Sequence, residues 1–502
     1  MAQTEHDMKR PETTSFTICA LIIACALACA CTPDENYTRL DEDAYSHKTD
    51  LGNRKEFIES RRVLLFYESG YNDLAGYLDS DMNQELVQGF IPTARRQDNV
   101  LLVFSKLMNK GNYVPVKSYL RRVYTDGEGK MRSDTLLTMG ESTVINSTST
   151  MKKVLSFVKE TFPAKGYGMV FSSHGSGWLP EGYYFSPSKF EKEHADELEG
   201  EETGISQMAF AADVPQNDIT EDPFYGMTRS IGMETYRHNG VSYSKELDID
   251  EFAEGIPFHL DFLLFDMCFT AGIELFYALK DKADIICGSA CEVLANGMFD
   301  YTKISDYLIG SAEPDVTGLL KESFDLYDKS SGVYRSSTVM IARTDGLDHV
   351  ASVCSRLFEK YRTQISGIDT YSVQPYHRNS TGRRYFYDIV DIFRQCGAEE
   401  TDILELSEAL DACTVFKANT PEFMSEITFR TYSGVSMFLP NSGTPLLRQY
   451  YRKESWNKAT GLLKWPEITA QALGFQKKSV SLHANLEASV LLVQWGSGIC
   501  RN

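Results

Sequence analysis

Short apolar runs recur between residues 62 and 290 and alternate with stretches of helical character. Such continuous runs are typical of strands that are buried on both faces of a mostly parallel sheet. We therefore expect strands at 62–69, 99–105, 167–173, 259–268 and 283–290. Helices are expected between them, at 73–90, 149–162 and 270–280. This alternation predicts an α/β fold with a mostly parallel central sheet flanked by helices.

The pattern changes at two places along the chain. Residues 179–230 are poor in apolar residues and include the acidic stretch "EKEHADELEGEE" at 191–202. They predict a surface insertion at 179–228, which is either a lid or processing loop or an inert solvated loop. Helical segments and strands resume after about residue 345, including an expected strand at 431–440. We expect one domain at 56–345 and a C-terminal α+β region at 346–502 packed on it.

The pattern at the N-terminus predicts a targeting segment that is not part of the folded domain. A basic Met8-Lys9-Arg10 precedes the apolar run Ser15 to Cys31, which has the length of a signal peptide core and is short for a membrane span. A cysteine after small residues resembles a bacterial lipoprotein signal, so residues 1–31 are the expected signal peptide. Cys31 is the expected lipidation site, with Cys25 and Cys29 left open. A plain secretory signal or a membrane anchor are the alternatives.

Residues 32–55 are polar and predict a tether between the lipid and the folded part. The acidic "TPDEN" after Cys31 resembles the surface-export signal of lipoproteins in gut Bacteroidetes. We therefore expect lipid attachment to the outer membrane of the cell envelope, facing the cell surface.

Composition and charge narrow the class of protein. The chain has 502 residues, of which 42% are hydrophobic and 12% aromatic, as expected for a globular protein with a large core. A net charge of −20 makes nucleic acid a poor partner. The cysteines beyond the signal are scattered, which excludes a disulfide scaffold. Cys287 and Cys291 lack the partners of a zinc site, and no phosphate-binding loop is present, so we expect neither metal nor cofactor.

Two expected strands end at residues whose side chains can take part in catalysis. "VFSSHGSGW" (170–178) ends an apolar run at His174, and "LLFDMCFTAG" (263–272) ends another at Cys268. In open α/β sheets ligands bind at the carboxyl ends of the strands, so adjacent strands would bring the two side chains together. Taken alone, such a cysteine is usually a core residue and such a His-Gly is usually a turn. The combination favours catalysis.

A cysteine beside an imidazole or at a helix N-terminus becomes a nucleophilic thiolate. We expect the helix that follows Thr270 to contribute to this activation. Gly175 lets the backbone approach a substrate, and the N–H groups of Gly175 and Cys268 are the expected oxyanion hole.

"SSHGSGW" followed by "FDMCFTAGIELFYAL" resembles the clostripain family of cysteine peptidases, which belongs with caspases, legumains and gingipains. The resemblance extends over about 60–500, excluding the insertion, through four further segments: "TRSIGMET" (228–235), "ADIICGSACEVLANGMFDY" (283–301), "YSGVSMFLP" (432–440) and "SWNKAT" (455–460). It implies a caspase-like sandwich with a dyad in which His174 is the base and Cys268 the nucleophile. Asp266 matches the acid that recognises arginine or lysine at P1, the residue before the scissile bond. The alternative for Asp266 is a structural role in which its carboxylate bonds to backbone.

Further residues bear on this resemblance, either as additional pocket candidates or as departures from the family. Glu292 and Asp300 are candidate acids at the edge of the pocket, although structural roles are favoured for both. Met267 and Phe269 depart from the smaller or different residues that are usual in the family. Clostripain responds to calcium and is processed into two chains. The sequence shows no EF-hand loop, and processing sites are expected at Lys189 or Lys192.

The leading hypothesis is a lipid-anchored, monomeric cysteine endopeptidase that cleaves peptides or proteins after Arg or Lys. One alternative is a binding lipoprotein on an inactive peptidase fold, which the presence of both His174 and Cys268 argues against. Another is a different thiol enzyme that transfers the acyl group to an acceptor other than water.

Overall fold

A computed structural model describes residues 61–464, apart from 96, 110–113, 185, 199–230, 239–240 and 383. The expected signal peptide, the tether with Cys31 and most of the insertion lie outside the described residues. In the part of the chain that is described, no helix is long and apolar enough to cross a membrane.

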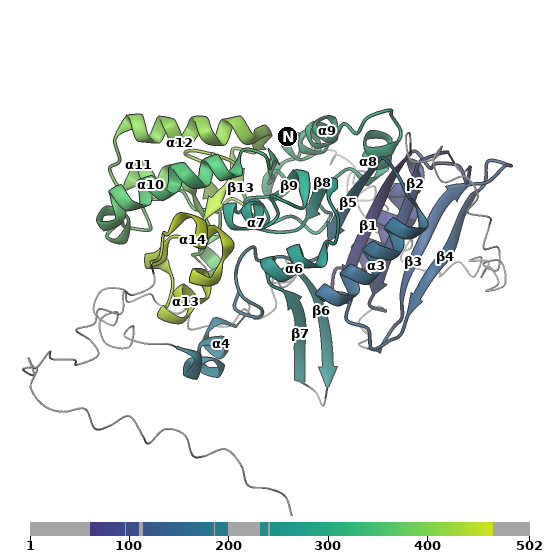
Figure 1. The fold of residues 1–502 in the computed structure, drawn as a ribbon, viewed down its shortest axis with the longest axis horizontal. Coiled ribbons are helices and arrows are strands. Elements are labelled where there is room, and N and C mark those ends of the chain that lie inside the picture. Colours follow the sequence, from purple (N-terminus) through teal and green to yellow (C-terminus); the bar gives the residue numbers. More distant parts are fainter. Residues whose placement is uncertain are drawn as a thin grey trace, which may run out of the picture. The chain divides into compact units, whose positions relative to one another are not determined.

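The central sheet has nine strands in the order β12-β10-β9-β8-β5-β1-β2-β3-β4 (Figure 1). Its middle is parallel and consists of the five strands expected from the apolar runs: β1 (Arg62–Gly70), β2 (Val100–Leu107), β5 (Gly166–Ser172), β8 (Leu260–Asp266) and β9 (Ala283–Gly288). Most of their residues are buried. The prediction of a mostly parallel sheet is therefore confirmed.

Antiparallel strands extend the sheet at both edges: β3 (Ser118–Thr125) and β4 (Met131–Met139) beside β2, and β10 (Thr338–Arg343) and β12 (Thr414–Asn419) beside β9. The β3–β4 hairpin was not expected from the sequence. Most residues of β4 are partly or fully exposed, so it lacks the apolar run that identifies a central strand.

Helices cover both faces of the sheet, which confirms the α/β sandwich. Leu65 and Tyr67 of β1 pack into one core, while Leu64 and Phe66 pack into the other, as the alternation of side chains along a strand requires. The first core includes buried residues of α3 (Thr148–Thr161), α6 (Ile249–Gly255) and α7 (Ile273–Ala278). The second includes those of α8 (Tyr301–Ile309) and α9 (Val316–Asp328).

Three predicted elements differ from the structure. The helix expected at 73–90 is divided into α2 (Ala75–Ser80), a π turn at Asp81–Glu85 and a 3-10 turn at Leu86–Gln88. The helix expected from Thr270 begins at Ile273. The strand expected at 431–440 is reduced to β15 (Ser436–Met437), which pairs with β11 (Tyr387–Asp388).

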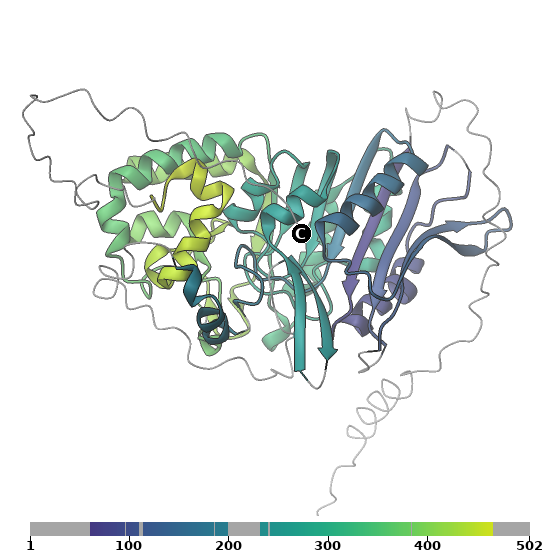
Figure 2. The same ribbon diagram turned by 60° about the horizontal axis from the view of Figure 1, so that its bottom comes forward.

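Residues after 345 add helices and return to the central sheet through β12, which pairs with β10. The helices are α10 (Leu347–Ser366), α11 (Ile389–Gln395), α12 (Glu400–Cys413), α13 (Pro445–Lys453) and α14 (Ser455–Thr460). Figure 2 shows them grouped at the end of the sheet opposite β4. Hydrogen bonds and buried side chains thus connect the two sides of the boundary expected at residue 345.

The remaining strands form small hairpins, β6 (Ile231–His238) with β7 (Val241–Leu247) and β13 (Glu422–Phe423) with β14 (Ile427–Thr428). The described start of the insertion contains α4 (Pro187–Glu193), which carries Lys189 and Lys192. Glu191 of α4 bonds to Thr444, and Glu197 just after it bonds to Gln449 and Tyr450. Both lysines therefore lie in a helix that is docked on the C-terminal region.

Candidate active site

The two strands that end on His174 and Cys268 are neighbours in the sheet. Strands β5 and β8 run parallel, and Ser172 pairs with Asp266, so His174 and Cys268 each lie two residues beyond the same register position. Gly175 makes this close approach practicable, because a Cβ at that position would lie 2.7 Å from the Cys268 carbonyl oxygen. The adjacency expected from the sequence is thus present, although 94 positions separate the two residues.

The turn after the nucleophile is conformationally strained. Phe269 adopts a φ of 57°, in the left-handed region that large side chains rarely occupy. Its N–H donates to the Cys291 carbonyl at 2.9 Å, and its ring stacks on Phe386 with the centroids 4.2 Å apart. These contacts hold the turn that presents Cys268 at the end of β8.

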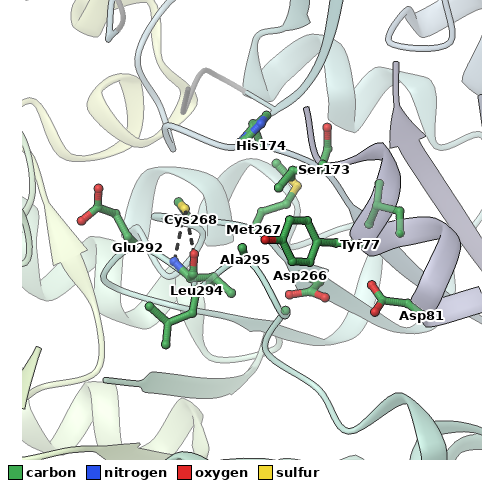
Figure 3. Close-up of a pocket in the computed structure, with 14 residues that line it drawn as sticks. Tyr77, Asp81, Ser173, His174, Asp266, Met267, Cys268, Glu292, Leu294 and Ala295 are labelled. Carbon is green, nitrogen blue, oxygen red and sulfur yellow. Dashed lines mark hydrogen bonds between the residues drawn. The ribbon is translucent and has the colours of Figure 1, made fainter. Parts of the chain in front are cut away.

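The Cys268 thiol is paired with backbone rather than with the imidazole. Its Sγ accepts a hydrogen bond from the Val293 N–H at 3.2 Å and lies 3.9 Å from the Val293 carbonyl (Figure 3). Burial, and to a smaller extent the charge of Glu292, raise the pKa of the thiol to about 12. The expected lowering of this pKa by a helix N-terminus is not found, and the thiol is neutral in this arrangement.

Glu292 lines the pocket and forms an ion pair that sequence reasoning missed. Arg378 donates two hydrogen bonds to the Glu292 carboxylate, at 2.6 and 3.0 Å, and both side chains are buried. The carboxylate raises the Cys268 pKa and the guanidinium lowers it. This pair therefore ties the loop after β9 to the C-terminal region and also sets the local potential at the thiol.

His174 is buried and has an acidic partner that the sequence analysis did not identify. Its Nε2 lies 2.7 Å from Oδ1 of Asp73, a half-exposed residue just beyond β1. Strand β1 neighbours β5, so Asp73 also lies at the carboxyl edge of the sheet. That position was the available signal, because acids at this edge are candidates to orient a catalytic imidazole.

Asp266 is fixed in place by the loop that follows β9. Its carboxylate accepts hydrogen bonds from the Met298 N–H at 2.6 Å and from the Tyr301 hydroxyl at 2.8 Å. Gly297, with a φ of +81°, allows the loop to close, since a Cβ there would lie 2.5 Å from Asp266 Oδ2. Burial nevertheless raises the pKa of Asp266 to about 6.

Asp300 does not line the pocket, contrary to one of the two roles considered for it. Its carboxylate accepts hydrogen bonds from the Thr302 N–H and hydroxyl and caps the N-terminus of α8. A carboxylate is a favourable cap at this position, because it satisfies a backbone donor and complements the helix dipole.

One open pocket is bordered by His174, Cys268, Asp266 and Glu292 (Figure 3). It is lined by residues from four segments: 74, 77, 78 and 81 after β1, 173 and 174 after β5, 266–268 at the end of β8, and 292–295 with 297 after β9. Its empty volume is about 570 Å³, including the solvent at its mouth. Cys268 and His174 border the same pocket as Asp266, so a bound peptide can contact all three.

A parallel-centred α/β sandwich with a cysteine and a histidine at the ends of neighbouring strands is the arrangement of caspase-like cysteine peptidases. The model of the clostripain family matches residues 66–192 and 233–468. The chain therefore belongs to the clostripain family, and the enzyme class that follows is a cysteine peptidase, a hydrolase.

Solved structures with the same fold come from Parabacteroides and Bacteroides species. An inactive zymogen C11 protease from Parabacteroides distasonis is 22% identical, with a TM-score of 0.59 over 80% of this chain and 97% of that one. A secreted C11 cysteine protease from Bacteroides thetaiotaomicron, iotapain, is 23% identical, with a TM-score of 0.59 over 80% and 99%. The latter organism's secreted C11 protease in complex with an irreversible peptide inhibitor matches at 19% identity and a TM-score of 0.57, over 80% and 98%. No curated protein sequence matches significantly.

Proposed function

We propose that this cysteine peptidase acts through a Cys268–His174 dyad. The observation that carries the proposal is the matching position of the two residues beyond β5 and β8, at one pocket. In the reaction, His174 takes the thiol proton and Cys268 Sγ bonds to the scissile carbonyl carbon. The C–N bond then breaks as His174 returns the proton to the leaving amine, which leaves a thioester. Water, deprotonated by His174, hydrolyses that thioester and restores the thiol.

Two backbone donors and one carboxylate support these steps. The N–H groups of Gly175 and Cys268 stabilise the oxyanion, which is consistent with the contact of Gly175 against the Cys268 carbonyl. Asp73 orients the imidazole through its contact with Nε2 and balances the charge that forms on the ring. The hydrogen bond that the Val293 N–H donates to Sγ lowers the pKa of Cys268, so it supports formation of the thiolate.

The P1 side chain is proposed to be arginine or lysine, recognised by Asp266. This carboxylate lies in the pocket at the last residue of β8, two residues before Cys268. An ion pair between a buried carboxylate and a basic side chain is a strong and directional interaction.

The cellular setting is also a proposal. The apolar segment ending at Cys31 supports lipid attachment to the outer membrane, and one structural relative is described as secreted. A monomer that acts on peptides or proteins, and not on nucleic acid, is consistent with the net charge of −20.

The direct test is hydrolysis by residues 32–502 of fluorogenic peptides with Arg, Lys, Asp or Ala at P1, beside the Cys268→Ala variant. We expect cleavage after Arg and Lys that disappears in the variant. Cleavage confined to another P1 residue would refute the role of Asp266 while keeping the dyad. Absence of cleavage, also after limited trypsin treatment, would favour an inactive binding lipoprotein. Transfer to an added amine without hydrolysis would indicate a different acyl-transfer enzyme.

A further inference from the structure

Carboxylates from neighbouring strands converge below the pocket. Glu68 of β1 pairs in register with Ser172 of β5, which pairs with Asp266 of β8. Residues in register on adjacent strands project from the same face of a sheet, so these three side chains form one row. The Tyr301 hydroxyl lies 3.0 Å from the Ser172 hydroxyl and donates to Asp266, which closes the row from the side of α8.

Asp81, the first residue of the π turn after α2, faces this row from across the pocket (Figure 3). It lines the pocket together with Asp266, yet only 4% of the residue is exposed. Its carboxylate makes no hydrogen bond or ion pair with the described residues. Glu68 is fully buried, and neither of its carboxylate oxygens has a hydrogen-bond partner. Asp81 at the pocket and Glu68 beneath it are therefore buried acids that lack well-placed donors, and the Ser172 hydroxyl gives Glu68 only weak compensation.

The electrostatic surroundings of these acids contain no compensating cation. Burial, followed by the charges of Asp266 and Glu85, raises the pKa of Asp81 to about 8. Burial raises the pKa of Glu68 well above its usual range, and the charges of Asp81 and Asp266 raise it further. The Ser172 hydroxyl lowers this pKa, but its effect is the smallest of the four. The charges of this cluster also raise the pKa of the phenols of Tyr301 and Tyr327 and of the thiols of Cys268 and Cys287. A cation that enters the pocket would provide the positive charge that is missing around these acids.

We propose that Asp81 is a second specificity-determining carboxylate, which together with Asp266 binds the guanidinium of a P1 arginine, with Glu68 reinforcing the negative potential beneath them. The inference rests on the proposed function, because it identifies the substrate side chain of the same site. Two carboxylates on different elements match the several N–H edges of a planar guanidinium better than the single ammonium of lysine. Asp81 thus makes the pocket selective for arginine.

Binding is measured separately from catalysis with a peptide that ends in agmatine, the decarboxylated analogue of arginine, and therefore has no scissile bond. Its affinity for the full chain is compared by calorimetry with that of the matching pentylamide, which lacks the cation. We expect Asp81→Asn to weaken binding of the agmatine peptide about tenfold or more and to leave the pentylamide unchanged. Asp79→Asn is the matched control, because Asp79 lies two residues before Asp81, at the end of α2, and its exposed carboxylate bonds to Asn83.

A second measurement needs no variant. Acids that are neutral in the empty pocket must ionise when the cation binds, so agmatine-peptide binding near pH 7 releases protons to the buffer. Calorimetry in buffers of different ionisation enthalpy detects that release, and the pentylamide should show none. Equal proton release by both ligands would overturn the proposal.

Hydrolysis then tests the selectivity with peptides that differ only in arginine, lysine or citrulline at P1. In Asp81→Asn we expect kcat/KM for arginine to fall more than for lysine, chiefly through KM, while citrulline changes little. An unchanged ratio of arginine to citrulline, or binding of Ca²⁺ in place of the agmatine peptide, would refute the role of Asp81. If the binding results hold but Cys268→Ala still cleaves, the proposed dyad fails and the cation pocket stands.

Discussion

At the scale of single residues, each reacting side chain has a partner from a distant part of the sequence. His174 contacts Asp73, and Cys268 responds to Glu292 and, with opposite sign, to Arg378. These partners influence when the thiol ionises and how the imidazole is oriented, whereas in the proposed mechanism the reaction itself belongs to Cys268 and His174. They can therefore be changed without removing the chemistry.

Replacing Asp73 by Asn should lower kcat by roughly 10²-fold with little change in KM. The amide no longer neutralises the imidazolium that forms during the reaction and leaves the ring less well oriented. Steady-state kinetics on an arginine peptide measure the effect, with Asp79→Asn as the control. A change confined to KM would show that Asp73 contacts substrate instead of positioning His174.

Replacing Glu292 by Gln should make Cys268 more reactive. The carboxylate raises the thiol pKa and Arg378 lowers it, so removing only the carboxylate moves the pKa downward. For each unit of that shift the thiolate fraction at pH 8 rises about tenfold. The rate of iodoacetamide modification at Cys268, followed by peptide mass spectrometry, reports this. Glu426→Gln, which removes the more exposed partner of Arg378, is the control. Slower modification of Glu292→Gln would contradict the assignment.

At the scale of elements, the site depends on an irregular segment. The helix that follows β1 changes to a π turn at Asp81, and this turn lines one side of the pocket. The Asp81 carboxyl has no partner in this turn, so its ionisation destabilises the folded protein. In the proposed role the segment binds substrate, and its contribution to the free energy of unfolding depends on pH.

The Asp81→Asn variant should therefore gain stability relative to the wild type as pH rises. The folded-state pKa of about 8 exceeds the ordinary value of 3.8, so the folded chain holds this proton more tightly than the unfolded chain. That contribution is complete below pH 4 and is lost as pH rises through 8. Melting temperatures at pH 5 and pH 8 should show a difference, variant minus wild type, that is a few degrees larger at pH 8. An unchanged difference would show that Asp81 ionises normally.

At the scale of the whole molecule, the C-terminal residues complete both the sheet and the site. Strand β12 covers the edge of β10, and Phe386 and Arg378 contact the turn and the loop that surround Cys268. The nucleophile is thus enclosed by segments from before and after residue 345.

A chain ending at residue 345 should consequently fail to fold cooperatively. It would expose the edge of β10 and the apolar surface that α7 presents to α10 and α14, and it would leave Glu292 without Arg378. Circular dichroism and size-exclusion chromatography, compared with residues 61–464, measure this. A soluble, cooperatively unfolding fragment would show that the first domain is independent.

The sequence by itself determined the parallel centre of the fold and the position of His174 and Cys268 at the ends of two of its strands. Strands buried on both faces require continuous apolar runs, and His174 and Cys268 each end such a run. Local sequence also located the switch from strand to turn, through the glycines beside His174 and the small residues after Cys268.

Tertiary structure alone decided the partners. Asp73, Asp81 and Arg378 lie in unremarkable polar surroundings along the chain. Only strand order brings Asp73 to His174, the break in the helix after β1 brings Asp81 to the pocket, and the return of the C-terminal region brings Arg378 to Glu292. The β3–β4 hairpin escaped prediction because an edge strand exposed to solvent needs no apolar run. Burial and neighbouring charge, which set the ionisation of Cys268, Asp266 and Asp81, are properties of the folded packing and have no local sequence signature.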